Sequence, residues 1–446
     1  MTVTSSLPIE AVRDAIVTAL DAGPRAVLVA PPGAGKTTRV PLMLLDRPWA
    51  AGGRIVLLEP RRLAARAAAE RMAATLDEAV GETVGLRARF DTRVSARTRI
   101  EVVTEGVFTR LIADDPELAG VAAVIFDEFH ERSLDADLGL ALALDVQGAL
   151  RDDLRIVVMS ATLDGARVAA ILDGAPVIES QGRAFPVETR YVGRNPERDL
   201  ASDVAAVVVR ALGEEPGSVI AFLPGQREIL RAADALAGRI GANTDVTPLF
   251  GAMDRAAQDR AVRPSLPGRR KVVLATSIAE TSLTIEGVRV VVDGGQTRIP
   301  RFEPDLGLTR LETVRVSRAA ADQRRGRAGR TEPGVCYRLW EEAGNGALQA
   351  YARPEILDAD LSGLLLDLAS WGVRDPATLR WLDPPPAPAV TAGRALLESL
   401  EALDRDGTVT AEGRAMAGLA LPPRLARMVL EAARRGAAEA GAELAV

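Results

Sequence analysis

Short apolar runs rich in valine, isoleucine and leucine alternate along the chain with longer stretches in which apolar residues recur every three or four positions. The short runs predict buried β-strands, and the longer stretches predict amphipathic helices. Their alternation predicts a parallel sheet covered on both faces. Between residues 26 and about 181 the predicted strands cover 26–30, 54–58, 100–103, 121–126 and 155–159, and a short polar segment at 180–183 follows.

A second alternating region follows this polar segment. It predicts strands at 218–223, 244–249, 271–275 and 289–293 and helices at 226–237 and 254–261. Residues 297–302 and 309–316 alternate around Glu303-Pro304-Asp305-Leu306-Gly307, which predicts a β-hairpin. The chain is therefore expected to form two α/β units in tandem.

Strands largely stop after about residue 351. Helices are predicted at 360–371 and 391–404, then a short strand at 408–410 and a helix at 410–419, which is the pattern of a small winged-helix module. The proline-rich run 384–388 predicts a stiff polyproline connector. Residues 437–446 lie in or just after a helix without an evident cap, so we expect this chain to be part of a longer protein.

The amino-acid composition limits the classes of protein to which this chain can belong. The 446 residues, 48% of them hydrophobic, predict about two to four domains. The single cysteine, Cys336, excludes an internal disulfide, and with one histidine it excludes a zinc module. It fits a reducing compartment, and a cytoplasmic location is expected because neither a membrane-length apolar run nor a signal peptide is apparent.

The net charge of −6 gives no support for nucleic-acid binding by bulk charge. Any such site must be local. The candidate is the stretch 297–330, which contains nine arginines and four acidic residues.

A glycine-rich loop follows the first predicted strand and precedes a helix. It reads Ala30-Pro31-Pro32-Gly33-Ala34-Gly35-Lys36-Thr37-Thr38, with Ala30 where the first glycine usually stands. In a phosphate-binding loop, backbone N–H groups surround an anion at a helix N-terminus. Lys36 would then contact the β- and γ-phosphates of a nucleotide, and the Thr37 hydroxyl would bind Mg²⁺. An ordinary turn of an α/β protein is the alternative.

Rare residues support the first interpretation. Of the 55 basic residues only Lys36 and Lys271 are lysines, so a lysine in this loop indicates a need for a compact ammonium group. The only histidine, His130, lies in a second motif, Asp127-Glu128-Phe129-His130, which ends the predicted strand 121–126. Acidic residues at the carboxyl end of such a strand lie where ligands bind. Asp127 would hold Mg²⁺, with Glu128 as a further candidate ligand, and Glu128 would also orient or deprotonate the attacking water. A solvated strand end is the alternative.

With these motifs the chain resembles the DEAH-box helicases of superfamily 2, and among them the bacterial HrpB type, in which Phe stands where most relatives carry Ala. The resemblance runs through nearly all 446 residues. It implies an α/β fold of two tandem RecA-like domains, at 1–181 and 182–348. A mostly helical winged-helix region at 349–418 and the start of a ratchet-like domain at 419–446 would follow.

The arginine-rich motif Gln323-Arg324-Arg325-Gly326-Arg327-Ala328-Gly329-Arg330 belongs to the same resemblance. Arginines three apart on a helix share a face. The family implies that Arg327 and Arg330 reach across to the nucleotide as arginine fingers and that Gln323 positions the water. A basic helix face for RNA or solvent is the alternative.

Further motifs of the family are expected to contact nucleic acid, the nucleotide or the moving strand. The nucleic-acid contacts are expected from Arg61, Arg62, Arg89, Thr104, Gly106, Thr276, Ser277, Ser282 and Thr284. Ser160 and Thr162 are expected to couple ATP state to strand movement. Glu286 and Arg71 are expected near the ribose and the base, although Val262 stands where the family has an aromatic partner for that base.

The resemblance implies an ATP-dependent RNA helicase or translocase that uses ATP and Mg²⁺. It would move 3′ to 5′ along single-stranded RNA, or DNA, as a monomer with no membrane attachment. Two other functions stay open. One is an ATP-gated clamp that remodels RNA–protein complexes without processive unwinding, and the other is an inactive partner-binding scaffold.

Overall fold

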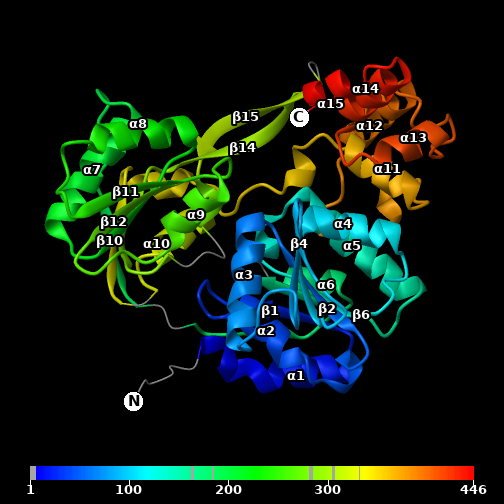
Figure 1. The fold of residues 1–446 in the computed structure, drawn as a ribbon, viewed down its shortest axis with the longest axis horizontal. Coiled ribbons are helices and arrows are strands. Elements are labelled where there is room, and N and C mark those ends of the chain that lie inside the picture. Colours follow the sequence, from blue (N-terminus) through cyan, green and yellow to red (C-terminus); the bar gives the residue numbers. More distant parts are fainter. Residues whose placement is uncertain are drawn as a thin grey trace.

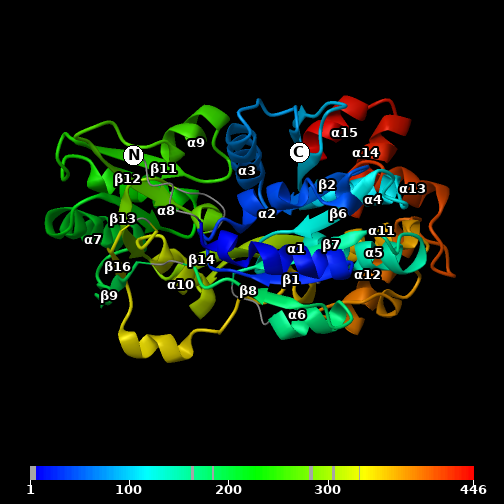
Figure 2. The same ribbon diagram turned by 90° about the horizontal axis from the view of Figure 1, so that it is seen from below.

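The computed structural model describes residues 7–161, 165–182, 185–280, 285–303, 307–330 and 332–445. Two sheets form two lobes that lie side by side, and a group of helices from the C-terminal part of the chain packs on the first lobe (Figure 1). Figure 2 shows the same arrangement after a 90° turn, with the second lobe on one side and the first lobe with the C-terminal helices on the other.

The first sheet contains eight strands in the order β4-β3-β5-β2-β6-β7-β1-β8. All neighbours pair in parallel except β4, which is antiparallel to β3. The five predicted strands are confirmed, and the prediction missed three strands: β3 and the short edge strands β4 and β8. The strands are β1 (Arg25–Val29), β2 (Arg54–Glu59), β3 (Val84–Ala88), β4 (Asp91–Arg93), β5 (Ile100–Thr104), β6 (Val121–Phe126), β7 (Arg155–Ser160) and β8 (Val177–Glu179).

Helices cover both faces of this sheet, as predicted. One face packs on α1 (Arg13–Ala22), α2 (Lys36–Leu44) and α3 (Arg62–Thr75). The other packs on α4 (Glu105–Asp114), α5 (Leu134–Ala149) and α6 (Gly165–Ile171). The apolar core of the second face continues into the C-terminal helices, so these helices share a core with the first lobe.

The second sheet has six parallel strands in the order β11-β12-β10-β13-β16-β9. Its predicted strands and helices are confirmed to within a few residues, and β9 and β16 were not predicted. The strands are β9 (Val187–Tyr191), β10 (Ser218–Phe222), β11 (Thr244–Leu249), β12 (Arg270–Ala275), β13 (Val288–Asp293) and β16 (Gly334–Arg338). The helices are α7 (Leu200–Glu214), α8 (Gln226–Leu236), α9 (Arg255–Val262) and α10 (Arg318–Gly326).

The predicted hairpin is confirmed as β14 (Gln296–Glu303) paired antiparallel with β15 (Leu308–Arg315). It extends from the second lobe toward the C-terminal helices (Figure 1). At its tip, a Cβ on Gly307 would lie 2.8 Å from the Arg424 guanidinium, so the hairpin contacts the helical region.

The C-terminal region is mostly helical, as predicted, and differs from the prediction in two details. The expected strand at 408–410 is a single bridge between Leu403 and Val409. The helix expected at 391 begins at Ala387, inside the predicted polyproline run, because a proline in the first turn of a helix loses no intrahelical hydrogen bond. The helices are α11 (Ser362–Ser370), α12 (Ala387–Ser399), α13 (Ala411–Ala417), α14 (Pro423–Arg434) and α15 (Ala438–Ala445). None of the helices in the described part of the chain is long and apolar enough to cross a membrane.

Candidate active site and nucleic-acid cleft

The glycine-rich loop lies between β1 and α2 and begins the site. Gly33 and Gly35 have φ of +84° and +94°, the left-handed region that glycine adopts at little cost. A Cβ on Gly35 would lie 2.7 Å from Leu7 Cδ1, so the loop is also too closely packed for a side chain there. Ala34 is buried and Thr38 lies in the first turn of α2. The loop thus presents backbone N–H groups at a helix N-terminus, as an anion site requires.

The acidic pair lies beside this loop because β6 ends next to the start of α2. Lys36 Nζ is 2.9 Å from Glu128 Oε1 and 3.7 Å from Asp127 Oδ1. The Thr37 hydroxyl donates to Asp127 Oδ2. Lys36, Thr37 and both acids, predicted from two separate motifs, are therefore brought together.

Their ionisation follows from burial and from the lysine. Burial would raise the pKa of Glu128, but the surrounding cationic groups, Lys36 foremost, together lower this pKa to about 2. For Asp127 burial prevails over Lys36, and its pKa is raised. The pKa of Lys36 is raised although burial opposes this, because two carboxylates face it. Lys36 and Glu128 thus form a buried ion pair.

Sequence reasoning missed Glu59, the last residue of β2. Burial first, and then the neighbouring Asp127 and Glu128, raise the pKa of Glu59 well above its usual value. Its protonated form is therefore favoured beside the acidic pair. Its position directly before Pro60-Arg61 at the end of a parallel strand was the available signal.

His130 connects the two lobes. Its Nε2 lies 2.6 Å from Gln323 Nε2 in α10, and its Nδ1 accepts from the Ala161 N–H at 3.3 Å. Burial lowers the pKa of His130, so the ring is neutral. With Nδ1 accepting, the proton is on Nε2, and this tautomer requires Gln323 to turn its amide oxygen toward the ring.

Arg327 and Arg330 also face the first lobe. The Arg330 Nε lies 3.9 Å from where a Cβ on Gly33 would stand, and Arg327 Nε donates to the Glu280 carbonyl at 2.9 Å. Burial lowers the pKa of Arg330 to about 10, an effect that Glu128 opposes. Burial, and next the charge of Arg330, lower the pKa of Arg327 well below its usual value. Two buried cations side by side favour an anionic ligand between them.

The prediction that Arg327 and Arg330 share one face of a helix is wrong, although both side chains do face the first lobe. Helix α10 ends at Gly326, so Arg327 and Arg330 lie in the turn beyond it. A Cβ on Gly329 would lie 2.6 Å from the Phe185 carbonyl, which holds this turn against the segment before β9. Tertiary contact, rather than helical spacing, directs both side chains to the first lobe.

Arg324, from the same motif, has a structural role instead. It is buried between Glu280 and Asp293, with Nε 2.7 Å from Glu280 Oε1 and Nη1 2.7 Å from Asp293 Oδ1. Its guanidinium lies 5.0 Å from the centre of the Phe222 ring. Arg324 therefore anchors the loop that contains Glu280, to which Arg327 binds.

The structure does not bring every predicted nucleotide contact to the site. Arg71 is exposed on α3 and Glu286 is exposed in the turn before β13, and the described contacts join neither to the phosphate loop. Ser160 is buried at the end of β7, in register with Val29 of β1. Thr162, Ser282 and Thr284 lie outside the described residues.

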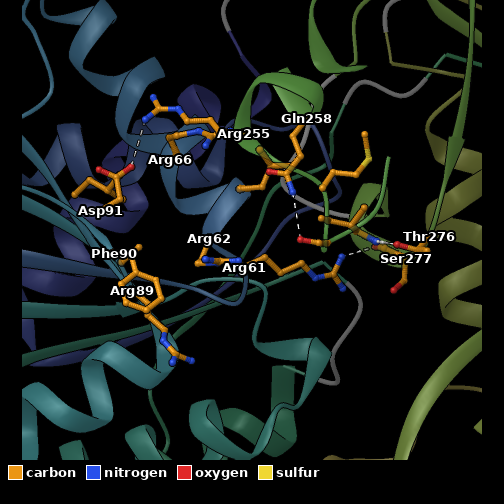
Figure 3. A pocket seen from close by; sticks show the side chains of 16 residues that line it. Arg61, Arg62, Arg66, Arg89, Phe90, Asp91, Arg255, Gln258, Thr276 and Ser277 are labelled. Atoms are coloured by element: carbon orange, nitrogen blue, oxygen red, sulfur yellow. Dashed lines mark hydrogen bonds and ion pairs between the residues drawn. The ribbon is translucent and has the colours of Figure 1, made fainter. Parts of the chain in front are cut away.

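A cavity of about 610 Å³ opens between the lobes beside this site (Figure 3). Its lining includes the predicted nucleic-acid residues Arg61, Arg62, Arg89, Thr276 and Ser277, and Phe90, which the resemblance to the family places with Arg89 in a turn that touches the strand backbone. It also includes Arg66, Asp91, Arg255 and Gln258, which sequence reasoning had not assigned. Thr104 and Gly106, at the start of α4, are not in its lining. Five arginines and one aspartate line the cavity. Arg61, Arg66 and Arg255 pair with acidic residues, whereas the described contacts give Arg62 and Arg89 no acidic partner, so these two carry the uncompensated positive charge of the cavity.

Contacts across this cleft join its two walls. Arg61 donates to the Ser277 carbonyl and lies 3.0 Å from Glu131, and Arg66 pairs with Asp259 at 2.7 Å. The basic stretch predicted at 297–330 does not supply this charge. Much of it is neutralised by local ion pairs of Arg298 with Glu228, Arg301 with Glu312, Arg310 with Glu303, and Arg324 with Glu280 and Asp293. A count along the sequence cannot detect such pairing.

Comparison with known proteins gives consistent matches. Residues 10–171 match the DEAD/DEAH box helicase family and residues 203–332 match the helicase conserved C-terminal domain. The chain is 51% identical over 441 residues to the ATP-dependent RNA helicase HrpB of Escherichia coli K12, covering 99% of this chain and 54% of that protein. It is 35% identical over 413 residues to the ATP-dependent RNA helicase HrpA homolog of Haemophilus influenzae, covering 91% of this chain and 32% of that protein.

Solved structures agree with these matches. The crystal structure of the Escherichia coli DEAH/RHA helicase HrpB superposes with a TM-score of 0.93 at 51% identity, covering 99% of this chain and 56% of that one. The structure of the E. coli DExH-box NTPase HrpB gives a TM-score of 0.88 at the same identity, covering 100% of this chain and 55% of that one. The chain thus spans about half the length of the HrpB proteins it matches.

Proposed function

Because the chain belongs to the DEAD/DEAH box helicases, we propose that it hydrolyses ATP between its two lobes and moves single-stranded RNA 3′ to 5′. One observation carries the proposal. Lys36, Thr37 and the acidic pair in the first lobe meet Gln323, Arg327 and Arg330 of the second, and the 2.6 Å contact of Gln323 with His130 joins them. The printed names of the relatives support RNA as the substrate, and the direction is inferred from the resemblance to the family.

The first lobe would bind the triphosphate and activate water. Phosphates at the N-terminus of α2 would compete with Glu128 for Lys36. Since Lys36 is the strongest influence that lowers the pKa of Glu128, its transfer to the phosphates would make the Glu128 carboxylate more basic. Glu128 could then accept a proton from water, held in place by His130 and Gln323.

Thr37 and Asp127 would hold Mg²⁺. A hydroxyl and a carboxylate oxygen already in mutual contact are the hard ligands that this ion prefers. When bound, the ion would withdraw charge from the phosphate oxygens.

The second lobe would supply positive charge to the transition state. Arg330 has a pKa of about 10 and so remains protonated near neutral pH. Arg327 and Arg330 together would stabilise the charge that spreads over the transferred phosphoryl group. Glu286 and Arg71 near the ribose and base remain predictions.

Single-stranded RNA would occupy the cationic cleft. Phosphates would bind Arg61, Arg62 and Arg89 from the first lobe and the Thr276 and Ser277 segment from the second. Contacts from Thr104, Gly106, Ser282 and Thr284, and coupling through Ser160 and Thr162, are further predictions of the same proposal. Because both walls of the cleft belong to the lobes that enclose ATP, closure around the nucleotide would shift the strand.

The test measures phosphate release with and without oligouridylate. Glu128→Gln should reduce RNA-stimulated hydrolysis by about 10²- to 10⁴-fold, the usual contribution of a general base. The exposed Glu117→Gln should retain the wild-type rate. Equal rates for wild type and Glu128→Gln would remove the assigned base.

Direction and unwinding need separate duplexes. A duplex with a 3′ single-stranded overhang should be separated, and a duplex with a 5′ overhang should not. ATP-dependent binding without strand separation would instead favour the clamp.

A further inference from the structure

Phe90 is an unusual residue on the first-lobe wall of the cleft. Its side chain is 89% exposed, the highest value among the exposed large apolar residues of the described chain. It lies with Arg89 in the two-residue turn between β3 and β4, where Ala88 pairs with Asp91. Such exposure of a phenyl ring is unfavourable in the free protein.

The backbone at Phe90 is unfavourable as well. Its φ is +65°, in the left-handed region where glycine and asparagine are preferred. A residue other than glycine held in this region carries local strain, and such strain gathers at functional sites. The turn therefore bears two costs, exposure and strain, that asparagine or glycine at this position would avoid.

The surroundings indicate the ligand. The Arg89 guanidinium lies 5.0 Å from the centre of the Phe90 ring, so one face of the ring is covered by a cation. Figure 3 shows Phe90 on the wall opposite Thr276 and Ser277, with Arg89 beside it. Four further arginines, Arg61, Arg62, Arg66 and Arg255, also line the cavity. An aromatic ring in a groove of positive charge is the arrangement with which proteins bind single-stranded nucleic acid, by stacking on bases and pairing with phosphates.

We propose that Phe90 is a stacking platform for one nucleobase of the strand in the cleft. The base would lie on the ring face away from Arg89, while the cleft arginines bind the flanking phosphates. The inference rests on the proposed function, since it requires a strand in this cavity. It adds to the site one side chain that contacts a base, whereas the other groups of the site contact the nucleic-acid backbone.

The ligand class follows from charge. A protein segment docking on Phe90 would have to bring acidic groups to Arg62 and Arg89, whereas every nucleotide brings a phosphate and a flat aromatic surface together. Stacking is tolerant of base identity because every base has such a surface. The proposal therefore predicts little base preference but a strong requirement for a base.

The test uses the whole chain and two fluorescent oligomers, oligouridylate and a ribose-phosphate oligomer of the same length without bases. Phe90→Asn keeps a residue that tolerates the left-handed backbone and removes the ring. It should bind oligouridylate about tenfold or more weakly than wild type and bind the abasic oligomer with wild-type affinity. Phe90→Trp should retain affinity, and its indole fluorescence should change with oligouridylate only. Leu266→Asn, which changes another exposed apolar side chain outside the cleft, 69% exposed, should bind like wild type.

Folding and binding are separated by unfolding measurements. Phe90→Asn should unfold at the same denaturant concentration as wild type or a higher one, because it relieves strain. Wild-type affinity of Phe90→Asn for oligouridylate would overturn the stacking proposal and leave the proposed function standing. Equal weakening toward both oligomers would overturn it too, since the ring would then act without a base. Failure of the wild-type chain to bind either oligomer would overturn the proposed function together with this inference.

Discussion

Replacing Arg324 with methionine should destabilise the second lobe strongly. The Arg324 side chain is 1% exposed and that of Asp293 is 0% exposed, and Glu280 binds the other side of the guanidinium. Methionine fills a similar volume but leaves two carboxylates facing each other in the core. Removing one partner of a buried ion pair costs about 3–5 kcal/mol. Because a typical domain is stable by about 5–15 kcal/mol, this loss is a large part of the total.

The assay is urea unfolding followed by circular dichroism, with Arg318→Met as the matched control. Arg318 is exposed at the start of the same helix, so its replacement should change the unfolding free energy by less than about 0.5 kcal/mol. Arg324→Lys should fall between the two, because an ammonium keeps the charge but loses the forked geometry.

Loss of hydrolysis should accompany loss of stability. The Glu280 carbonyl accepts from Arg327 Nε, so release of Glu280 would displace an arginine that faces the acidic pair. If Arg324→Met and Arg318→Met unfolded alike, the role of Arg324 as a buried anchor would be wrong.

Two further predictions concern the first lobe. Burial, opposed by the Ser133 hydrogen bond, raises the pKa of Glu105 from 4.5 to about 8, so its contribution to stability is complete below about pH 4.5 and is lost progressively as the pH rises from there to about 8. Glu105→Gln should therefore flatten the fall in melting temperature between about pH 5 and pH 8, and an unchanged slope would contradict this assignment. Arg132 binds Asp137 through two hydrogen bonds and Asp383 of the helical region at 2.7 Å, so Arg132→Met should cost about 3–5 kcal/mol in thermal unfolding. Asp383→Asn, which leaves the buried pair intact, should cost about 1 kcal/mol, and an equal loss for both variants would refute this distinction.

Features carried by neighbouring residues could be predicted from the sequence. The phosphate loop and the acidic pair each occupy a few consecutive positions at a strand end, where local geometry fixes the side chains. The contact between His130 and Gln323 joins residues 193 positions apart, and only the resemblance to a family made it expected. Spacing alone predicted that Arg327 lies on a helix face, but in the structure Arg327 lies in the turn after the helix.

Features set by tertiary packing were missed. The β3–β4 hairpin, which presents Phe90 to the cleft, has a polar edge strand of three residues and no apolar alternation. Arg132 follows His130 by two positions, yet its ion pair with Asp383 spans 251 residues. Its left-handed backbone, with φ of +52°, directs the chain from the acidic pair into α5. No local pattern indicates that the loop after the acidic pair supports the C-terminal helices.

The two lysines show what a rare residue does and does not indicate. Lys36 agrees with the argument that a lysine among many arginines serves a phosphate site. Its ammonium group contacts the acidic pair and, under the proposed function, would contact the phosphates of the nucleotide instead. Lys271 is also buried, but its ammonium donates to the carbonyls of Arg260, Ala261 and Arg263 at the end of α9. A compact cation with three donors satisfies those carbonyls, as a helix C-terminus requires. At both positions the rare lysine therefore marks a site that requires a compact ammonium group. Only the groups around each lysine show whether that ammonium serves folding or chemistry.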